Sequence, residues 1–200
     1  FNRLRSSADF SVSRFSGYFQ DNISVGDSSG LSIQAGVRFN YNDLNEELLI
    51  SPRAGISWKP VSWKRDIIFR GSAGIYHQPP FYREMRRYDG SINYSLKAQK
   101  SWQLSGGFDY NFKAFDRMLR LTTEAYYKNM WDVVPYDIDN VRMRYFGENK
   151  AKAYAAGLEA RLFGEVVRDA ESYISVGFMR TREDIEGDQF YNYTIDSLNR

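Results

Sequence analysis

The chain has 200 residues, a formal net charge of +2, and charged side chains at 26% of its positions. No apolar run is long enough for a transmembrane helix, and the nearly balanced charge gives no sign of a nucleic-acid partner. Because the sequence holds no cysteine, a disulfide framework and a thiolate metal site are both excluded.

The first part of the chain predicts a β-hairpin. Residues 15–25 alternate apolar and polar side chains, and residues 31–41 repeat the alternation more regularly. A period of two is typical of a strand with one apolar and one polar face. Residues 26–30, Gly-Asp-Ser-Ser-Gly, are rich in types that tolerate a positive φ, so we expect a tight turn there.

Two more strands are expected at residues 52–59 and 67–76, after a polar connection at 42–47. Both keep the alternation, with Ile56 and Trp58 on the apolar parity of the first. A long irregular stretch follows. It contains the doubled prolines Pro79 and Pro80 and a cluster of basic residues, and it extends over residues 77–94.

The clearest hairpin joins residues 102–112 to residues 119–131. Each run keeps its alternation for roughly the 9–11 residues that a tilted transmembrane strand needs, whereas strands of soluble proteins usually have about five or six. Trp102 lies at one end of the first run and Phe108 to Phe112 at the other, with smaller side chains between them. Rings at two levels are typical of a lipid-facing strand with two interfacial girdles.

The C-terminal part predicts strands at 154–162 and 173–180, preceded by an irregular stretch at 135–142. A polar loop is expected to begin at 183–188. The carboxylates in this loop, and those at 137 and 139, are candidates for Ca²⁺. Their spacing is not that of the twelve-residue calcium loop, so we interpret them as solvated acidic turns.

The connections between these runs alternate in size. Short turns lie near Asp27, Val61, Ala114 and Arg168, whereas generally longer connections lie near Asp43, Tyr88, Asp139 and after Arg182. If neighbouring strands are antiparallel, all short turns fall on one side, as in outer-membrane barrels with short periplasmic turns and longer extracellular loops. We therefore expect an all-β fold, an antiparallel transmembrane β-barrel with about eight recognisable strands.

A succession of seven segments carries a resemblance to a known family. They are GYFQDNISV (17–25), LSIQAGVRFNY (31–41), SPRAGISWKP (51–60), FRGSAGIYHQPPFYREM (69–85), LKAQKSWQLSGGFDYNF (96–112), LTTEAYYKNMWDVV (121–134) and NKAKAYAAGLEARLF (149–163). In this order they resemble the C-terminal half of the barrel of TonB-dependent outer-membrane receptors. Gln99 stands where the family's "EKS" motif has its acid.

The resemblance implies a barrel of about 22 strands with an N-terminal plug domain inside it and a short box that binds TonB. The sequence contains neither plug nor box, so we expect residues 1–200 to be a partial barrel domain, a piece of a larger protein of the outer membrane. Such a receptor takes up a scarce solute, for example a siderophore, cofactor, glycan or peptide. The resemblance implies that the ligand binds the extracellular loops and the plug, and that TonB pulls on the plug. Whether a surface lipoprotein is a further partner stays open.

Two sets of residues are candidates for function. The first set lies in the irregular stretch and offers guanidinium and aromatic groups to an extracellular anionic or ring-bearing ligand. The alternative is a solvated loop whose basic residues neutralise the lipopolysaccharide surface. The set is His77, Phe81, Tyr82, Arg83, Arg86, Arg87 and Tyr88. The second carries charge on the polar parity and is expected to face the lumen: Arg38, Arg53, Arg70, Glu124, Lys128, Glu159 and Arg161. His77, the only histidine, is also interpreted simply as the outer end of a strand.

An enzyme is not expected, because the sequence has no phosphate loop, nucleophile elbow or paired acid and base motif. We expect no cofactor and no metal, and the only lipid contact is the outer membrane. Two alternatives remain. A complete small barrel with an adhesin or structural role requires the first and last strands to pair. A soluble carbohydrate-binding β-sandwich requires Trp58, Phe108 and Tyr127 to be buried within the chain.

Overall fold

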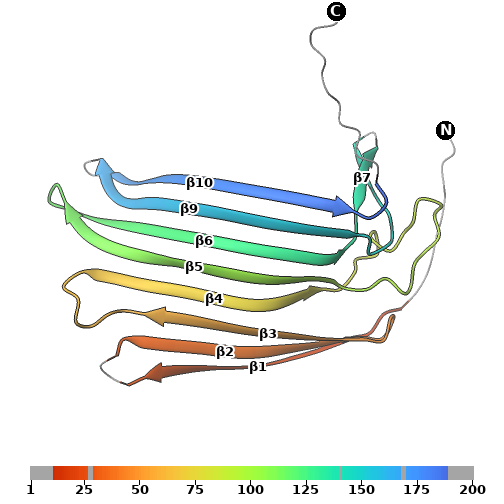
Figure 1. Cartoon of the computed structure of the whole chain (residues 1–200), viewed down its shortest axis with the longest axis horizontal. Helices are drawn as coiled ribbons and strands as arrows, with labels where there is room; N and C mark the ends of the chain where they lie inside the picture. Colours follow the sequence, from red (N-terminus) through yellow and green to blue (C-terminus); the bar gives the residue numbers. More distant parts are fainter. Residues whose placement is uncertain (1–10, 27–28, 140, 168–169, 189–200) are drawn as a thin grey trace, which may run out of the picture.

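The computed structural model describes residues 11–26, 29–139, 141–167 and 170–188. They form one eight-stranded antiparallel sheet and a separate two-stranded hairpin (Figure 1). The sheet strands are β1 (Arg14–Val25), β2 (Leu31–Asn42), β3 (Glu47–Trp58), β4 (Asp66–Gln78), β5 (Gln99–Ala114), β6 (Arg117–Val133), β9 (Ala151–Val167) and β10 (Ala170–Ile185). The hairpin is β7 (Tyr136–Asp139) and β8 (Arg142–Tyr145). Within these ranges, no helix is long and apolar enough to cross a membrane.

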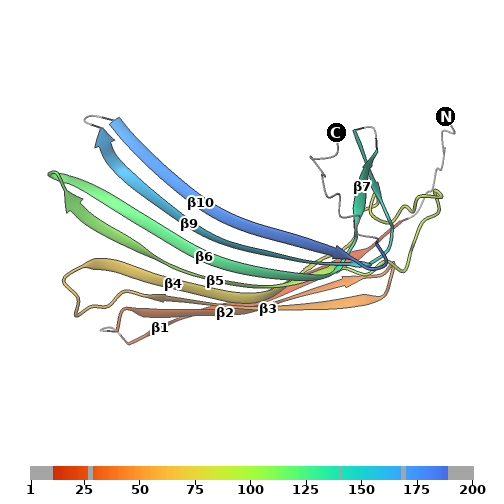
Figure 2. The same ribbon diagram turned by 45° about the horizontal axis from the view of Figure 1, so that its top comes forward.

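The sheet is a meander in the order β1-β2-β3-β4-β5-β6-β9-β10, with the β7–β8 hairpin inserted between β6 and β9. It is a single curved layer, and the hairpin stands away from it (Figures 1 and 2). Among the described strands, β1 and β10 are both edges, so the sheet does not close on itself. The alternative of a complete small barrel is therefore wrong for this sheet.

The strand register divides the side chains into two faces. One register row joins Gln20, Gly36, Arg53, Gly74, Gln103 and Lys128, and residues in such rows lie on the same face. We call this the polar face. The opposite, apolar face carries rows such as Trp58, Phe69, Phe108 and Thr123. The alternation predicted from the sequence is therefore the two-faced pattern of the sheet.

Within the part of the chain that the structure describes, no second layer covers either face. Trp58 is 41% exposed and Tyr127 37% exposed, although both lie on the apolar face. A β-sandwich would bury them against a second sheet, so the sandwich alternative is wrong.

The two ends of the strands differ. At the end that we call the turn end, short connections follow β1, β3, β5 and β9 (Figure 1). At the opposite end, the outer end, the connections are residues 79–98, which we call the outer loop, and residues 134–150, with a four-residue connection at 43–46 as the exception. The connections 79–98 and 134–150 are long, as predicted, whereas the one near Asp43 is shorter than the turn-end connection 59–65, and the one predicted after Arg182 extends beyond the described residues.

Most sheet strands extend a few residues beyond the predicted runs, as β9 does beyond 154–162, and three further differences lie toward the outer end. β3 begins at Glu47 rather than near Pro52. The sequence pattern misses its first residues because Leu48, Leu49 and Ile50 are three apolar residues in succession, although their burial alternates: Leu49 is 3% exposed and both of its neighbours are exposed. Residues 135–142, predicted to be irregular, contain β7 and the start of β8. β10 continues to Ile185, so the polar loop expected from residue 183 begins later.

The only hydrophobic cluster of buried residues in the described chain lies at the outer end. Met85, Leu96 and Val134 form it, and Leu44, Ile92 and Tyr145 pack against it. These side chains come from the connections 43–46, 79–98 and 134–150, with β8. The outer end is thus a packed structure that positions the candidate ligand residues.

Candidate functional site

All seven charged residues that the sequence assigns to the lumen lie on the polar face. Arg53 and Lys128 share one register row, Arg70 shares another with Glu124 and Glu159, and Arg38 and Arg161 lie in rows on either side. The residues come from five different strands, so the meander brings together positions far apart in the sequence.

A carboxylate on this face is held by two arginines. Asp109 Oδ2 lies 3.1 Å from Arg70 Nη2 and 3.1 Å from Arg120 Nη2, and the Thr122 hydroxyl donates to Asp109 Oδ1 at 2.7 Å. Asp109 is only 4% exposed. The sequence analysis named Arg70 but neither Asp109 nor Arg120 as site residues, although both lie on the polar parity. Three donors on one carboxylate fix the Arg70 side chain in place.

Glu124 and Glu159 lie directly opposite each other on β6 and β9. Their other neighbours in the row are Gly107 and Gly177, which carry no side chain. Like charges placed opposite each other on adjacent strands destabilise a sheet. A cationic group placed against the polar face would relieve this repulsion.

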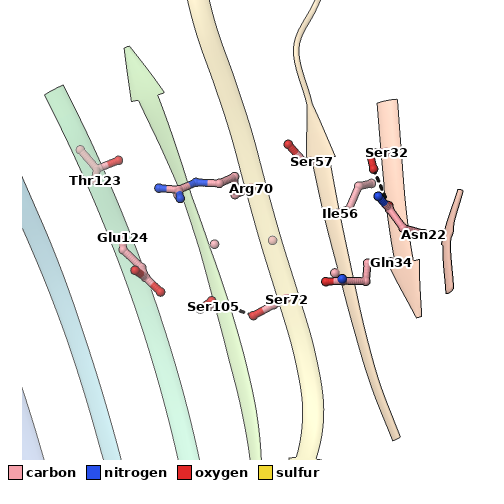
Figure 3. Close-up of a pocket in the computed structure, with 14 residues that line it drawn as sticks. Asn22, Ser32, Gln34, Ile56, Ser57, Arg70, Ser72, Ser105, Thr123 and Glu124 are labelled. Carbon is pink, nitrogen blue, oxygen red and sulfur yellow. Dashed lines mark hydrogen bonds between the residues drawn. The ribbon is translucent and has the colours of Figure 1, made fainter. Parts of the chain in front are cut away.

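Beside this pair the polar face is hollowed, with a volume of about 410 Å³. Figure 3 shows Arg70 and Glu124 on one side, Asn22, Ser32 and Gln34 on the other, and serines between them. Ser72 Oγ lies 2.9 Å from Ser105 Oγ, and the Ser32 hydroxyl donates to Asn22 Oδ1 at 2.8 Å. Short neutral polar side chains, glycines and Ile56 line the hollow, with Arg70 and Glu124 at its side, and this lining suits contact with water or a polar domain.

The apolar face carries its rings in two groups. Near the turn end, Phe69 lies 5.7 Å from Trp58, 5.9 Å from Trp63 and 6.2 Å from Phe108 between ring centroids. Toward the outer end, Tyr127 lies 5.1 Å from Trp102 and 6.1 Å from Tyr154. Side chains between the groups are smaller, for example Ala73 and Gly106. Such an arrangement matches two interfacial girdles with an apolar band between them.

The outer loop presents part of the predicted ligand set to solvent. Phe81 is 58% exposed, Tyr82 is 70% exposed, and Arg83 and Arg86 are also exposed. Glu84 fixes the turn beneath them, because its carboxylate Oε2 accepts from the Phe81 backbone N–H at 2.8 Å. The solvent-exposed groups therefore stand on an ordered support.

Arg87 and Tyr88 contact the connection 134–150 instead. Arg87 Nε lies 3.5 Å from Glu148 Oε1, and the Tyr88 ring packs edge-on against Phe146 at 5.1 Å. The ammonium of Lys150, which pairs with Glu148, and then the Arg87 guanidinium hold the pKa of the Glu148 carboxyl below its usual value. These two residues tie the outer loop to its neighbour, a role that the sequence did not indicate.

His77 lies at the end of β4, as one interpretation of the sequence had it. Its Nδ1 is 2.8 Å from Ser51 Oγ, and its side chain is half-buried. It does not join the exposed groups of the outer loop. No three His, Cys, Asp or Glu side chains come together to hold a metal ion anywhere in the described ranges, the residues around Asp184 included up to 188.

Comparisons with known proteins agree on one fold. A family model described as "TonB dependent receptor-like, beta-barrel" matches residues 1–199. Among curated proteins, none matches the sequence.

Solved outer-membrane proteins have a similar backbone. The outer membrane transporter YddB from Escherichia coli superposes with a TM-score of 0.63 at 15% identity, over 86% of this chain and 25% of that one. The siderophore receptor PirA from Pseudomonas aeruginosa superposes with a TM-score of 0.62 at 16% identity, over 85% of this chain and 32% of that one. The FrpB iron transporter from Neisseria meningitidis superposes with a TM-score of 0.59 at 14% identity, over 86% of this chain and 26% of that one. The chain thus spans a quarter to a third of the length of these proteins.

Proposed function

Because the chain belongs to the TonB-dependent receptor-like β-barrel family of the outer membrane, we propose that it supplies wall and outer loops to a receptor for energy-coupled uptake of a scarce solute. The observation that carries this proposal is the two-faced single layer: an apolar face with two levels of rings, and a polar face with mixed charge. Residues 1–200 are then part of one larger barrel domain.

A plug domain inside the barrel is the partner that the polar face supports best. The Glu124–Glu159 pair needs a cation, and a domain filling the lumen can supply a lysine or arginine against it. The hollow next to the pair offers serine and amide groups to the same domain. TonB would act on that plug, and the barrel residues described here would supply no chemistry of their own.

The ligand meets the outer loop first in this proposal. Phe81, Tyr82, Arg83 and Arg86 are exposed together over a few residues, and guanidinium forks with aromatic faces suit anionic or ring-bearing molecules. A siderophore is one such class, and the PirA structure is described as a siderophore receptor. Cofactors, glycans and peptides are the other classes, and a surface lipoprotein is a further partner.

The first experiment tests the wall. Single cysteines in the full-length protein, in outer membranes, are treated with a lipid-phase label at Ile33, Val37, Leu104 and Leu121, and at the matched polar-face positions Gln34, Arg38, Ser105 and Glu124. We expect labelling of the first set only. Equal labelling of both sets would contradict a lipid-facing apolar face.

The second experiment tests transport. Cells lacking the protein are complemented with the full-length form, with or without functional TonB, and offered ferric siderophores, cobalamin, glycans and peptides. We expect TonB-dependent depletion of one class, reduced when Tyr82 and Arg83 are both changed to Ala. Depletion that does not depend on TonB would refute energy coupling.

A further inference from the structure

The wall is incomplete between β3 and β4 at the outer end. Backbone pairing of these strands covers only Arg53–Trp58 against Phe69–Gly74. The rest of β3 stays paired with β2, and the last residues of β4 stay paired with β5. Residues 47–52 and 75–78 therefore form a seam, and Figure 1 shows the two ribbons separating there.

Pro52 gives the seam a cause. It is the first β3 residue beyond the paired segment, and it has no N–H to donate to a neighbouring strand. Other neighbouring strands in the sheet pair over most of their length, as β5 and β6 do. The break is thus a local property of β3 and β4.

Side chains close the seam in place of the backbone. Ser51 Oγ lies 2.8 Å from His77 Nδ1, and the Arg53 guanidinium stands 5.5 Å from the centre of the Tyr76 ring. Ser51 is 3% exposed, so its contact with His77 is shielded from water.

At the outer end of the seam, Glu47 reaches past β4 to the outer loop and to β5. Its Oε2 accepts from the Ala98 backbone N–H at 2.8 Å and from Asn45 Nδ2 at 3.2 Å, and its Oε1 lies 3.5 Å from Lys100 Nζ. The Glu47 side chain is 17% exposed. One carboxylate of β3 thus holds both the end of the outer loop and the start of β5.

The partner of Glu47 is itself fixed. Lys100 Nζ also lies 2.8 Å from Asp132 Oδ2. Asp132 has a φ of 54°, within the interval where the β6–β9 register shifts between Met130 and Val133. This irregularity breaks the alternation at Asp132, so that Lys100 sits between carboxylates of β3 and β6.

We propose that Glu47 is a positioning residue, which links β3 to the outer loop and to β5 at the open end of the β3–β4 seam and thereby seats the outer loop in its ligand-ready position. The effect of Glu47 on ligand binding rests on the proposed function, whereas its effect on the position of the outer loop is independent of that function. Removing the carboxylate leaves the Ala98 N–H without its acceptor and Lys100 with one anion instead of two, and the loop then moves relative to β3.

The test measures the loop position without any ligand. Spin labels are attached to the full-length protein in outer-membrane vesicles at Leu48→Cys on β3 and Arg83→Cys in the outer loop, both exposed. We expect one narrow distance distribution, which Glu47→Ala broadens. In Glu47→Ala, hydrogen exchange of residues 79–98 should rise by about fivefold or more, because local opening costs less free energy once the Glu47 contacts are absent.

Two variants sharpen the result. Glu47→Gln keeps the size of the side chain and an acceptor for Ala98 but loses the charge that attracts Lys100, so it should assemble normally and give an intermediate broadening. Glu46→Gln makes the same change of charge at the exposed preceding residue, in the connection 43–46, and should leave the distribution unchanged.

Unchanged distances and exchange in both Glu47 variants would overturn the proposal. So would an equal rise of exchange in the β5–β6 hairpin, because that indicates a general loss of stability. If TonB-dependent uptake is established, Glu47→Gln should raise the solute concentration for half-maximal uptake and leave the maximal rate unchanged. A loosened loop without any uptake would refute the proposed function but retain the role of Glu47 in seating the loop.

Discussion

The outer end and the strands of this sheet are held together by different forces. Met85 is 2% exposed and Leu96 1% exposed at the outer end, where three connections pack as in a soluble protein. Along the strands, by contrast, Leu104 on the apolar face is 52% exposed, and cohesion comes from backbone pairing. The strands need a lipid outside and a polar filling inside, whereas the outer end brings its own core. Changes of the same type should therefore have different effects in the two regions.

The largest effect is expected from a charge on the apolar face. Leu104→Arg should cost about 2–4 kcal/mol of folding free energy in a bilayer, because the guanidinium would lie in hydrocarbon. Gln103→Arg, one residue away on the polar face, should cost much less. Urea titration of the full-length protein in lipid vesicles, followed by tryptophan fluorescence, measures both. Equal losses would show that the two faces do not differ in their surroundings.

The next effect tests backbone pairing in the strands. A Cβ at Gly107 would lie 1.9 Å from the Thr123 carbonyl oxygen, whereas at Gly106 the nearest atom is 3.8 Å away. Gly107→Ala should force β5 and β6 apart and cost about 1–3 kcal/mol, typical of overpacking. Gly106→Ala is the control and should be nearly neutral in the same titration. If Gly107→Ala leaves the folding free energy unchanged, the β5–β6 pair adjusts to the added methyl group without cost.

A third change tests the polar contacts of the outer end. Gln99 Nε2 donates to Glu84 Oε1 at 2.9 Å, and Glu84 is 6% exposed. Gln99→Glu restores the acid typical of the family motif but puts two carboxylates together, and it should cost about 1–3 kcal/mol locally. Hydrogen exchange of residues 79–98 should rise while that of β5–β6 stays constant. An unchanged outer loop would show that the contact contributes nothing.

The smallest effect is expected from pH. The pKa of Glu148 is lowered in the folded chain by Lys150 and Arg87, so its ion pairs stabilise the outer end above its unfolded pKa and are lost as pH falls through the folded value. An exposed pair of this type contributes under about 1 kcal/mol. Exchange of residues 141–150 should therefore rise slightly as pH falls through the folded pKa of Glu148, and Glu148→Gln should remove that pH dependence. If the pH dependence of exchange persists in Glu148→Gln, another titrating group causes it.

The sequence predicted the strands better than the outer end for a physical reason. A strand with lipid on one side and polar surroundings on the other must alternate, so runs such as 31–41 and 102–112 were recognisable. Packed connections follow no period. Met85 and Leu96 lie in a stretch without alternation, and their burial depends on Val134, nearly 40 positions further on.

The candidate sites divide in the same way. The polar parity placed the seven charged residues on one face, but neither the Glu124–Glu159 opposition nor the Asp109 cluster follows from parity, because both depend on register between strands. Likewise, the sequence predicts that Glu47 ends a polar connection, and nothing local shows that it reaches Ala98, 51 residues away. Register and long-range contact are fixed only in three dimensions.

The meander has a consequence for the order in which this part of the chain folds. Every strand of the sheet pairs with the preceding one, except that β9 pairs with β6 across the β7–β8 insertion. Short closures cost less entropy than long ones, and local pairings form early. The turn-end hairpins should therefore assemble first, and the closures over residues 79–98 and 134–150 last. The segment that we expect to meet the ligand would complete the folding of this region.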